Sequence, residues 1–252
     1  MNYRGFAYLY DELMSDVPYD DWVNWTRKAI LERPFVSKKR LLDIACGTGE
    51  LSLRFANAGF DVTGLDLSED MLAVANSKAM EQGISIPFIM QDMSDMEGLG
   101  SFDIAVIFCD SLNYLPNAEA VRKTFEGVSR HLEPGGTFLF DVHSCYKINT
   151  IFAGNTFTLN EEHIAYIWDC YPGSHPDSVE HDLTFFVENE STGLYERIDE
   201  SHFQRTFPPE TYKELLYQAG FSNVSIMADF QETSPGEDSE RIFFTALKPL
   251  KK

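Results

Sequence analysis

The sequence is poor in positive charge. Twenty lysine and arginine residues stand against 40 aspartate and glutamate residues, which gives a formal charge of −20. Binding to a phosphate backbone depends on basic side chains that neutralise it, so nucleic acid is disfavoured as a partner. The most obvious basic run is Lys38-Lys39-Arg40, just before an expected strand, and we interpret it as a solvated loop.

Cysteines are few and apolar runs are short. Cys46, Cys109, Cys145 and Cys170 lie far apart, which predicts neither a disulfide scaffold nor a zinc site. No apolar stretch approaches the roughly 18 residues that a membrane helix needs. The opening MNYRGFAYLYDELM also lacks the features of a signal peptide. We therefore expect a cytoplasmic protein without a membrane partner, and the 44% apolar content is ample for a core.

From residue 41 onward, short apolar runs alternate with amphipathic stretches, which is typical of βα units around a parallel sheet. Helices are expected from 20 to 31, after Gly49, after Ser68, before a Pro134-Gly135-Gly136 stop, and from about 209 to 219. The expected strands are 41–45, 61–66, 86–91, 103–109, 136–142, 222–229 and 240–247. The pattern predicts an α/β fold.

Between residues 145 and 206 the period changes to simple alternation, as in HIAYIWDCY and DLTFFVE. Turn clusters lie at 172–174 and 189–193. This pattern indicates an inserted antiparallel sheet. We expect residues 1–144 and 207–252 to form one domain and 145–206 to form a β-rich lid over a substrate.

The strongest local signal is LLDIACGTGEL at 41–51, where a buried strand runs into a glycine turn that opens a helix. Such a turn lets a ligand approach the backbone closely. No Gly-Lys-Ser/Thr follows, which excludes a nucleotide-triphosphate loop. A nicotinamide or flavin site is disfavoured because Ser52 stands where a third glycine or alanine is expected and Glu50 would face a pyrophosphate.

The segment Asp43-Ile44-Ala45-Cys46-Gly47-Thr48-Gly49 resembles motif I of the class I S-adenosylmethionine-dependent methyltransferases. The resemblance implies a Rossmann-like, seven-stranded, mostly parallel sheet whose last strand is antiparallel. It also implies S-adenosylmethionine as cofactor and S-adenosylhomocysteine as product. Asp43 would help to hold the methionine end of the cofactor. The whole set of cofactor-binding residues that we expect is Tyr10, Tyr19, Asp43, Ala45, Cys46, Gly47, Gly49, Asp66, Leu67, Met71, Gln91, Asp92, Met93 and Cys109.

Two further acids follow strands at spacings that match this family. Asp66 ends the expected strand 61–66, where a carboxylate accepts both ribose hydroxyls; the alternative is a cap for the helix beginning near Ser68. Asp92 in FIMQDMSDM resembles the acid that accepts from the adenine amino group, with Met93 beside the ring. The alternative for Asp92 is an ordinary turn residue.

Several segments suggest a closer kinship with the YqeM-like bacterial methyltransferases. They are FAYLYDELM with PYDDW near the N-terminus, CDSLNYL at 109–115, FDVHS at 140–144 and DSERIFF at 238–244. CDSLNYL is not the Asn/Asp-Pro-Pro-Tyr signature of enzymes that methylate nucleobase or glutamine nitrogens. That departure lowers the odds of such substrates.

The methyl acceptor is expected at the carboxyl ends of the strands, where ligands gather in open α/β sheets. The candidate catalytic residues are Asp110, Asn113, Tyr114, His143 and His202. The loop residues among them equally suit a plain turn before the next helix. Of the N-terminal aromatic residues, Tyr10 and Tyr19 are candidates to close over the cofactor, with helix packing as the alternative.

Three functions stay open from the sequence. The first is an enzyme that methylates a small molecule, which the acidic surface favours. The second is an RNA methyltransferase with a small local recognition surface, and the third is a protein that binds S-adenosylmethionine without catalysis. We expect no metal, because the histidines between 163 and 202 match no ligand spacing. The oligomeric state is left open.

Overall fold

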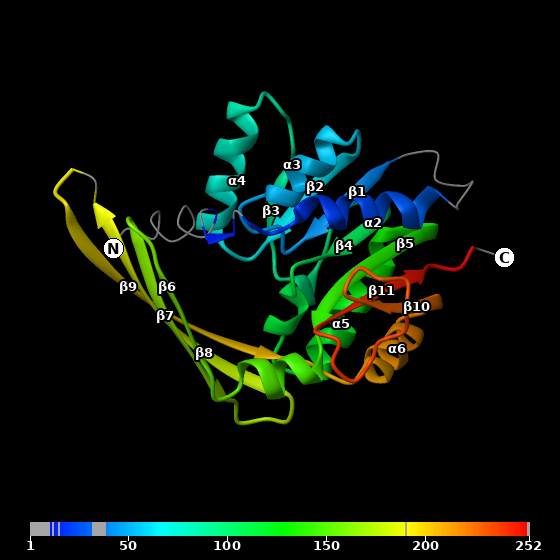
Figure 1. Ribbon diagram of the computed structural model, residues 1–252. Coiled ribbons are helices and arrows are strands. Elements are labelled where there is room, and N and C mark those ends of the chain that lie inside the picture. Colours follow the sequence, from blue (N-terminus) through cyan, green and yellow to red (C-terminus); the bar gives the residue numbers. More distant parts are fainter. Residues whose placement is uncertain (1–10, 12, 15, 32–38, 190, 251–252) are drawn as a thin grey trace.

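The computed structural model describes residues 11, 13–14, 16–31, 39–189 and 191–250. Its centre is a seven-stranded sheet in the order β10-β11-β5-β4-β1-β2-β3, flanked by helices on both faces (Figure 1). The strands are β1 Arg40–Ile44, β2 Asp61–Asp66, β3 Phe88–Met90, β4 Phe102–Ile107, β5 Leu132–His143, β10 Ser222–Ala228 and β11 Arg241–Leu247. Because β11 runs antiparallel to both of its neighbours, the expected fold class is confirmed.

Each face of the sheet has its own apolar cluster. On one face Trp22, Leu51 and Phe55 pack beneath α2 Tyr19–Leu31 and α3 Glu50–Asn57, with α4 Glu69–Glu81 beside them. On the other face Phe125 and Tyr212 come from α5 Ala118–His131 and α6 Pro209–Gln218. The sheet is therefore buried on both sides, which explains why its strands read as continuous apolar runs. Among the described residues, none of the helices is long and apolar enough to span a bilayer.

The helices α4 and α5 each begin directly after a polar residue that caps the helix N-terminus. The hydroxyl of Ser68 accepts from the Met71 amide at 3.3 Å at the start of α4. The side chain of Asn117 accepts from the Ala120 amide at 2.9 Å at the start of α5. Each cap satisfies an amide that the helix itself leaves unpaired.

The fifth strand begins earlier than the sequence predicts. The expected start was residue 136, after a Pro-Gly-Gly stop, but α5 ends at His131 and β5 starts at Leu132. The pairing with β4 shifts between Phe102–Leu132 and Ile104–Thr137, so the Pro-Gly-Gly segment lies in an irregularity of the strand. The expected strands 86–91 and 103–109 are shorter in the structure.

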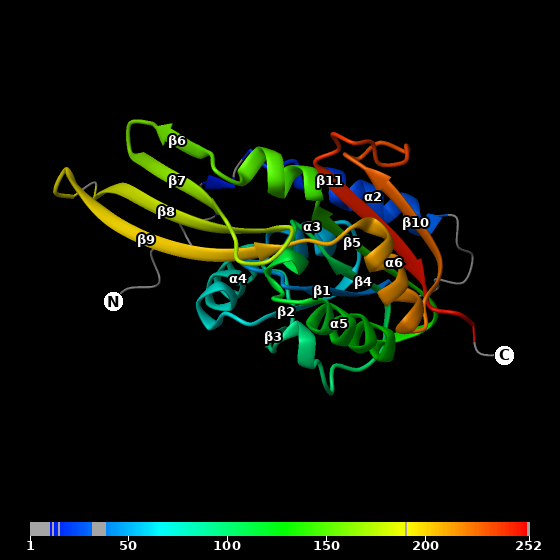
Figure 2. The same cartoon turned by 90° about the horizontal axis from the view of Figure 1, so that it is seen from below.

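Residues between β5 and α6 form a second, four-stranded antiparallel sheet in the order β6-β7-β8-β9. It extends away from the carboxyl ends of the parallel strands (Figures 1 and 2). Its strands are β6 Thr156–Asn160, β7 Ile164–Pro172, β8 Ser178–Asn189 and β9 Leu194–Arg205. A short π-helix, η3 Lys147–Phe152, precedes it and was not predicted. The long β7-β8-β9 register confirms the alternation read from the sequence.

Candidate functional site

The glycine turn after β1 forms a cradle. Ala45, Gly47 and Gly49 all have left-handed backbone, with φ of 57°, 54° and 76°. A Cβ on Gly47 would meet no atom within 4 Å, so this face of the turn is open. A Cβ on Gly49 would lie 2.9 Å from the Cβ of Ala75, so Gly49 is needed for close packing of α3 on α4. Of the two glycines, Gly47 is therefore the one that leaves room for a ligand.

Asp43 lies beneath this turn and is 2% exposed. The hydroxyl of Ser52 donates to its Oδ2 at 2.5 Å. Burial raises the pKa of Asp43 to about 7, against the hydrogen bond from Ser52, and nearby Asp66 raises it further. With Ala45, Cys46 and Gly47 it lines a cavity of 50 Å³. A buried carboxylate facing a cavity suits a cationic group, which fits the aminoacyl end of S-adenosylmethionine.

Asp66 ends β2 and bridges two backbone segments. Its Oδ2 accepts from the Gly47 amide at 2.8 Å, and its Oδ1 accepts from the Ser68 amide at 2.9 Å. Asp66 thus fixes the glycine turn to the start of α4 while remaining partly exposed. The helix-capping alternative therefore describes only one of its two oxygens. Leu67 beside it is 68% exposed, and the Met71 amide is bound by the Ser68 cap.

The segment after β3 is stabilised by hydrogen bonds between its own residues. Both ends of the Gln91 amide bond the backbone of Glu97, at 2.9 and 3.1 Å. Asp92 is exposed and accepts from the Ser94 amide and hydroxyl through the same Oδ1. Met93 packs against the apolar cluster beneath α5. Asp92 therefore caps the short 3₁₀ helix η1 Met93–Asp95 through Oδ1, and none of the described residues donates to its Oδ2.

Of the two aromatic candidates, Tyr10 lies outside the described residues. Tyr19 is the first residue of α2, is 8% exposed and packs in the apolar cluster with Trp22. Its ring also borders the 50 Å³ cavity, beneath the guanidinium of Arg54. Tyr19 therefore both packs in the helix interface and lines the cavity.

A sharp corner follows β4. Cys109 and Asp110 both have left-handed backbone, with φ of 53° each, a conformation that costs a residue with a Cβ on the order of 1–3 kcal/mol. Asp141 on β5 holds the corner, since its Oδ1 accepts from the Cys109 amide at 3.0 Å and its Oδ2 from the Asp110 amide at 3.1 Å. Asp141 is 0% exposed and also accepts from the Trp22 indole at 2.8 Å. The corner is thus fixed from beneath.

Arg241 on β11 joins two carboxylates. Its Nη1 pairs with Asp141, and its Nη2 donates to Asp110 Oδ1 at 2.9 Å. Its guanidinium also lies over the ring of Trp22, 5.5 Å from the centroid. The contacts of Trp22, Asp110, Asp141 and Arg241 therefore join α2, the corner after β4, β5 and β11. Four of the motifs that suggest the YqeM group meet here: PYDDW, CDSLNYL, FDVHS and DSERIFF. The fifth, FAYLYDELM, lies largely outside the described residues.

Asp110 is the member of this group that reaches outward. Its Oδ2 lies 3.1 Å from His143 Nε2 and accepts from the Gln204 amide of β9 at 3.0 Å. Burial alone would raise the pKa of Asp110, but the interactions of its carboxylate with the His143 ring and the Arg241 guanidinium outweigh burial and hold that pKa well below its ordinary value. Burial lowers the pKa of His143, against the attraction of Asp110. The pair at neutral pH is thus a carboxylate bonded by a neutral imidazole.

A cavity of 780 Å³ lies between this group and the second sheet. Of the candidate catalytic residues, Asp110, Tyr114, His143 and His202 line it. Asn113 does not. It is 0% exposed, with its amide oxygen accepting from the His143 amide at 2.9 Å and its nitrogen donating to the Arg205 carbonyl at 2.8 Å. Asn113 therefore anchors the end of β9 to the parallel sheet, and its side chain is not available to an acceptor.

The 780 Å³ cavity and the 50 Å³ cavity share two residues, Cys109 and Ser111. The left-handed corner is therefore the boundary between the glycine turn and the larger space. Burial and the adjacent Asp141 raise the pKa of the Cys109 thiol well above its ordinary value, so it stays a thiol. All four cysteines are free.

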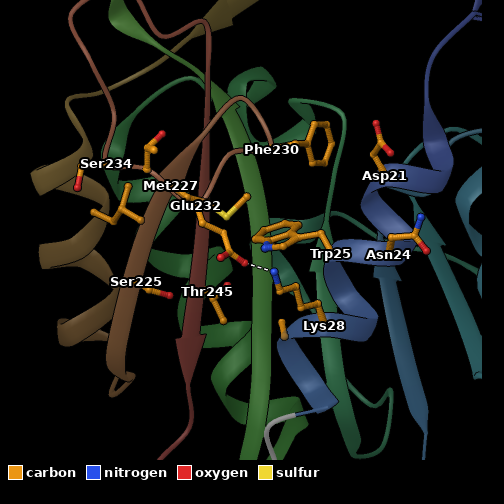
Figure 3. A pocket seen from close by; sticks show the side chains of 13 residues that line it. Asp21, Asn24, Trp25, Lys28, Ser225, Met227, Phe230, Glu232, Ser234 and Thr245 are labelled. Atoms are coloured by element: carbon orange, nitrogen blue, oxygen red, sulfur yellow. Dashed lines mark hydrogen bonds and ion pairs between the residues drawn. The ribbon is translucent and has the colours of Figure 1, made fainter.

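Another hollow of 610 Å³ lies on the helical face, between α2 and the β10–β11 pair (Figure 3). The Lys28–Glu232 ion pair crosses it, and Trp25 and Phe230 form part of its wall (Figure 3). It shares no lining residue with the other two cavities and holds none of the expected site residues. Among the described residues, no cluster of histidine, cysteine or acid side chains suits a metal ion.

Sequence reasoning did not single out three residues of this site: Asp141, Gln204 and Arg241. Two of them, Asp141 and Arg241, lie in segments already noted as group signatures, which was the available signal. Gln204 had none, because it lies in an alternating strand where every second side chain faces the same way.

Comparison with known proteins identifies the family of this architecture. A family model described as a methyltransferase domain matches residues 41–136. A relative from Geobacillus sp. (strain WCH70) is 51% identical over 98% of this chain and 100% of its own length. YqeM of Bacillus subtilis (strain 168) is 49% identical over 98% of each chain. Both relatives are named as methyltransferases, and neither name states an acceptor. A solved S-adenosylmethionine-dependent methyltransferase from Clostridium acetobutylicum has a TM-score of 0.88 at 29% identity, covering 98% of this chain and 99% of that one.

Proposed function

Because this chain belongs to the class I S-adenosylmethionine-dependent methyltransferases, in the YqeM group, we propose that it methylates a small molecule held between the parallel strands and the second sheet. The observation that carries the proposal is the shared corner. Cys109 and Ser111 border both the cavity at the glycine turn and the 780 Å³ cavity. A methyl group at this corner has the cofactor on one side and room for an acceptor on the other.

For part of the expected cofactor-binding set, the geometry supports a specific role. We assign the ribose hydroxyls to Asp66, whose bonds to Gly47 and Ser68 fix its position beside the open turn. The aminoacyl end is assigned to the cavity lined by Asp43 and Gly47, and the adenine to Asp92 through the oxygen that the η1 turn leaves over. S-adenosylmethionine supplies a methyl group that its sulfonium already activates.

The protein's own part is then alignment and exclusion of water. Holding two reactants in line can lower a barrier by roughly 7–11 kcal/mol in favourable systems. The left-handed corner at Cys109 is rigid because Asp141 binds both of its amides. We propose residues 145–206 as the lid of the acceptor site and the rest of the chain as the cofactor domain, with the Asn113 and Gln204 bonds joining the two.

Charge favours a small molecule over RNA. The formal charge of −20 repels a phosphate backbone. Both cations that line the large cavity are already paired, Lys147 with Glu240 at 3.1 Å and Arg241 with Asp110 and Asp141. We propose a cytoplasmic location, which suits a protein whose four cysteines are unpaired.

The experiment is incubation of the purified protein with methyl-labelled S-adenosylmethionine and a cell extract split into small-molecule, RNA and protein fractions. Label is expected in the small-molecule fraction, and Asp66→Ala should lose it. Label in RNA would contradict the charge argument. Cofactor binding without label in any fraction would show a non-catalytic protein.

A further inference from the structure

We infer that the acceptor atom is the nitrogen of an amine, bound beside Asp110 in the 780 Å³ cavity. The inference rests on the proposed function, since it names the chemical class of that acceptor. Three features of the cavity carry it: an excess of carboxylates, histidines that are weak bases, and aromatic walls.

The first feature is charge. Asp16, Asp110 and Glu161 line the cavity, while the lining cations are Lys147 and Arg241. Those two cations are themselves paired with further carboxylates, on Glu240 and Asp141. Three carboxylates and two cations thus line the cavity, and two further carboxylates pair with those cations. Such a wall favours a ligand that carries or develops positive charge and disfavours an anionic one.

The second feature is the weakness of the bases. His143, His181 and His202 all line the cavity. Burial lowers the pKa of each, and that of His181 falls to about 4. The Nε2 of His143 faces Asp110, while its Nδ1 is buried without a partner. A hydroxyl acceptor needs a base to take its proton as the methyl group arrives, and these histidines are poorly suited to that role.

The third feature is the aromatic surface of the second sheet. Tyr166, Trp168 and Phe185 of this sheet, together with Phe152 of η3, line the same cavity as Asp110. Aromatic faces attract ammonium groups electrostatically, and more strongly where water is excluded. The wall thus suits an amine on an apolar body.

The reaction of an amine matches this distribution of charge. The ammonium first loses one proton to solvent and binds as the free base. Its lone pair then forms the N–C bond as the C–S bond breaks, and the electron pair of that bond stays on sulfur. Positive charge therefore moves from sulfur, on the cofactor side of the corner, to nitrogen, on the side of Asp110. A fixed carboxylate where charge develops stabilises the transition state.

Asp110 is well placed for this role. Its two oxygens are held by Arg241, Gln204 and His143, and it lines the cavity at the corner itself. Because those neighbours keep its pKa low, it remains ionised at neutral pH. It needs no movement to meet the developing ammonium.

The first test uses the labelled small-molecule fraction of the extract. The labelled product is isolated, and its fragmentation in mass spectrometry shows whether the methyl group is on nitrogen, oxygen, sulfur or carbon. Methyl on nitrogen is the expected result. Methyl on another atom would overturn the amine assignment and leave the proposed function intact, whereas a small-molecule fraction without label would overturn the proposed function itself.

The second test compares Asp110→Asn with Asp199→Asn. Asp199 is an exposed carboxylate on β9, so the control removes the same charge without touching the cavity. Asp110→Asn should lower kcat for the amine on the order of 10²-fold, with cofactor affinity within twofold of the control, and Asp110→Glu should restore part of it. Circular dichroism checks that each variant is folded. A kcat equal to that of Asp199→Asn would exclude Asp110 from the site.

Discussion

The two halves of the site are built in different ways. The cofactor half comes from consecutive segments of the chain, from β1 through the Asp92 turn, and its contacts join neighbouring strands. The acceptor half gathers six residues from five separate segments: Trp22, Asp110, Asp141, His143, Gln204 and Arg241. The first is a set of local loops, which we propose as the cofactor site. The second is a buried ionic group that depends on the completed fold.

The largest expected effect breaks the acceptor half. Arg241→Met leaves Asp110 and Asp141 without their shared cation, and removing one partner of a buried ion pair costs about 3–5 kcal/mol. Urea unfolding should show a fall in the free energy of unfolding of this order. Arg197→Met is the control, because Arg197 pairs with Asp199 on the exposed surface. An equal fall in the free energy of unfolding in the two variants would mean that the buried ion pairs of Arg241 contribute no more stability than an exposed ion pair.

The next effect concerns Asp43 in the cofactor half. Burial raises its pKa from 3.8 to about 7, so the folded protein binds more protons than the unfolded chain between these pH values. The free energy of unfolding should therefore fall as pH rises from about 4 to 7, by up to about 4 kcal/mol from this residue. Asp43→Asn should flatten that part of the curve. An unchanged slope would show that Asp43 titrates normally.

The acceptor half should respond to pH in the opposite direction. Burial lowers the pKa of His181 from 6.5 to about 4, so here the unfolded chain binds more protons. Its contribution is complete above pH 6.5 and is lost as pH falls to 4, with up to about 3 kcal/mol at stake. His181→Gln should reduce the loss on acidification, measured by urea unfolding at pH 7, 5.5 and 4. A steeper loss in the variant would contradict a neutral, buried imidazole.

The smallest expected effect is on cofactor affinity, and it tests whether the cofactor half and the acceptor half act independently. Asp66→Ala should weaken S-adenosylmethionine binding by about 1.5–3 kcal/mol, which is roughly 10- to 150-fold. Isothermal titration calorimetry measures it, with Asp61→Ala as control, since Asp61 is exposed at the other end of β2. Once cofactor is saturating, acceptor KM should be unchanged. A matching rise in acceptor KM would show that the halves are not separate.

The sequence predicts the structure of the proposed cofactor half, that is its turn, strand end and helix cap, because the determinants of these elements are local. The glycine turn after β1 and the acid that ends β2 are read from short segments, and the Ser68 cap lies three residues from its amide partner. The central strands of the sheet are predicted for the same reason, since β1 and β4 are continuous apolar runs buried on both faces. The Pro134-Gly135-Gly136 segment was misjudged because a strand can absorb such residues in an irregularity.

The acceptor half is less predictable because its partners are remote in sequence. Arg241 meets Asp110 across 131 positions and Asp141 across 100. Neither local period nor capping chemistry indicates which arginine pairs with which acid. Asn113 shows the same limit, since a polar loop residue suggests an acceptor contact until the fold shows both ends of its amide bonded within the protein.

A crystal structure with S-adenosylhomocysteine tests the central claim most directly, because it locates the sulfur from which the methyl group leaves. We expect the sulfur beside the Cys109–Asp110 corner, facing the 780 Å³ cavity, with the ribose on Asp66. A sulfur that faces away from this cavity, or a ligand bound in the 610 Å³ hollow beside α2, would contradict the account.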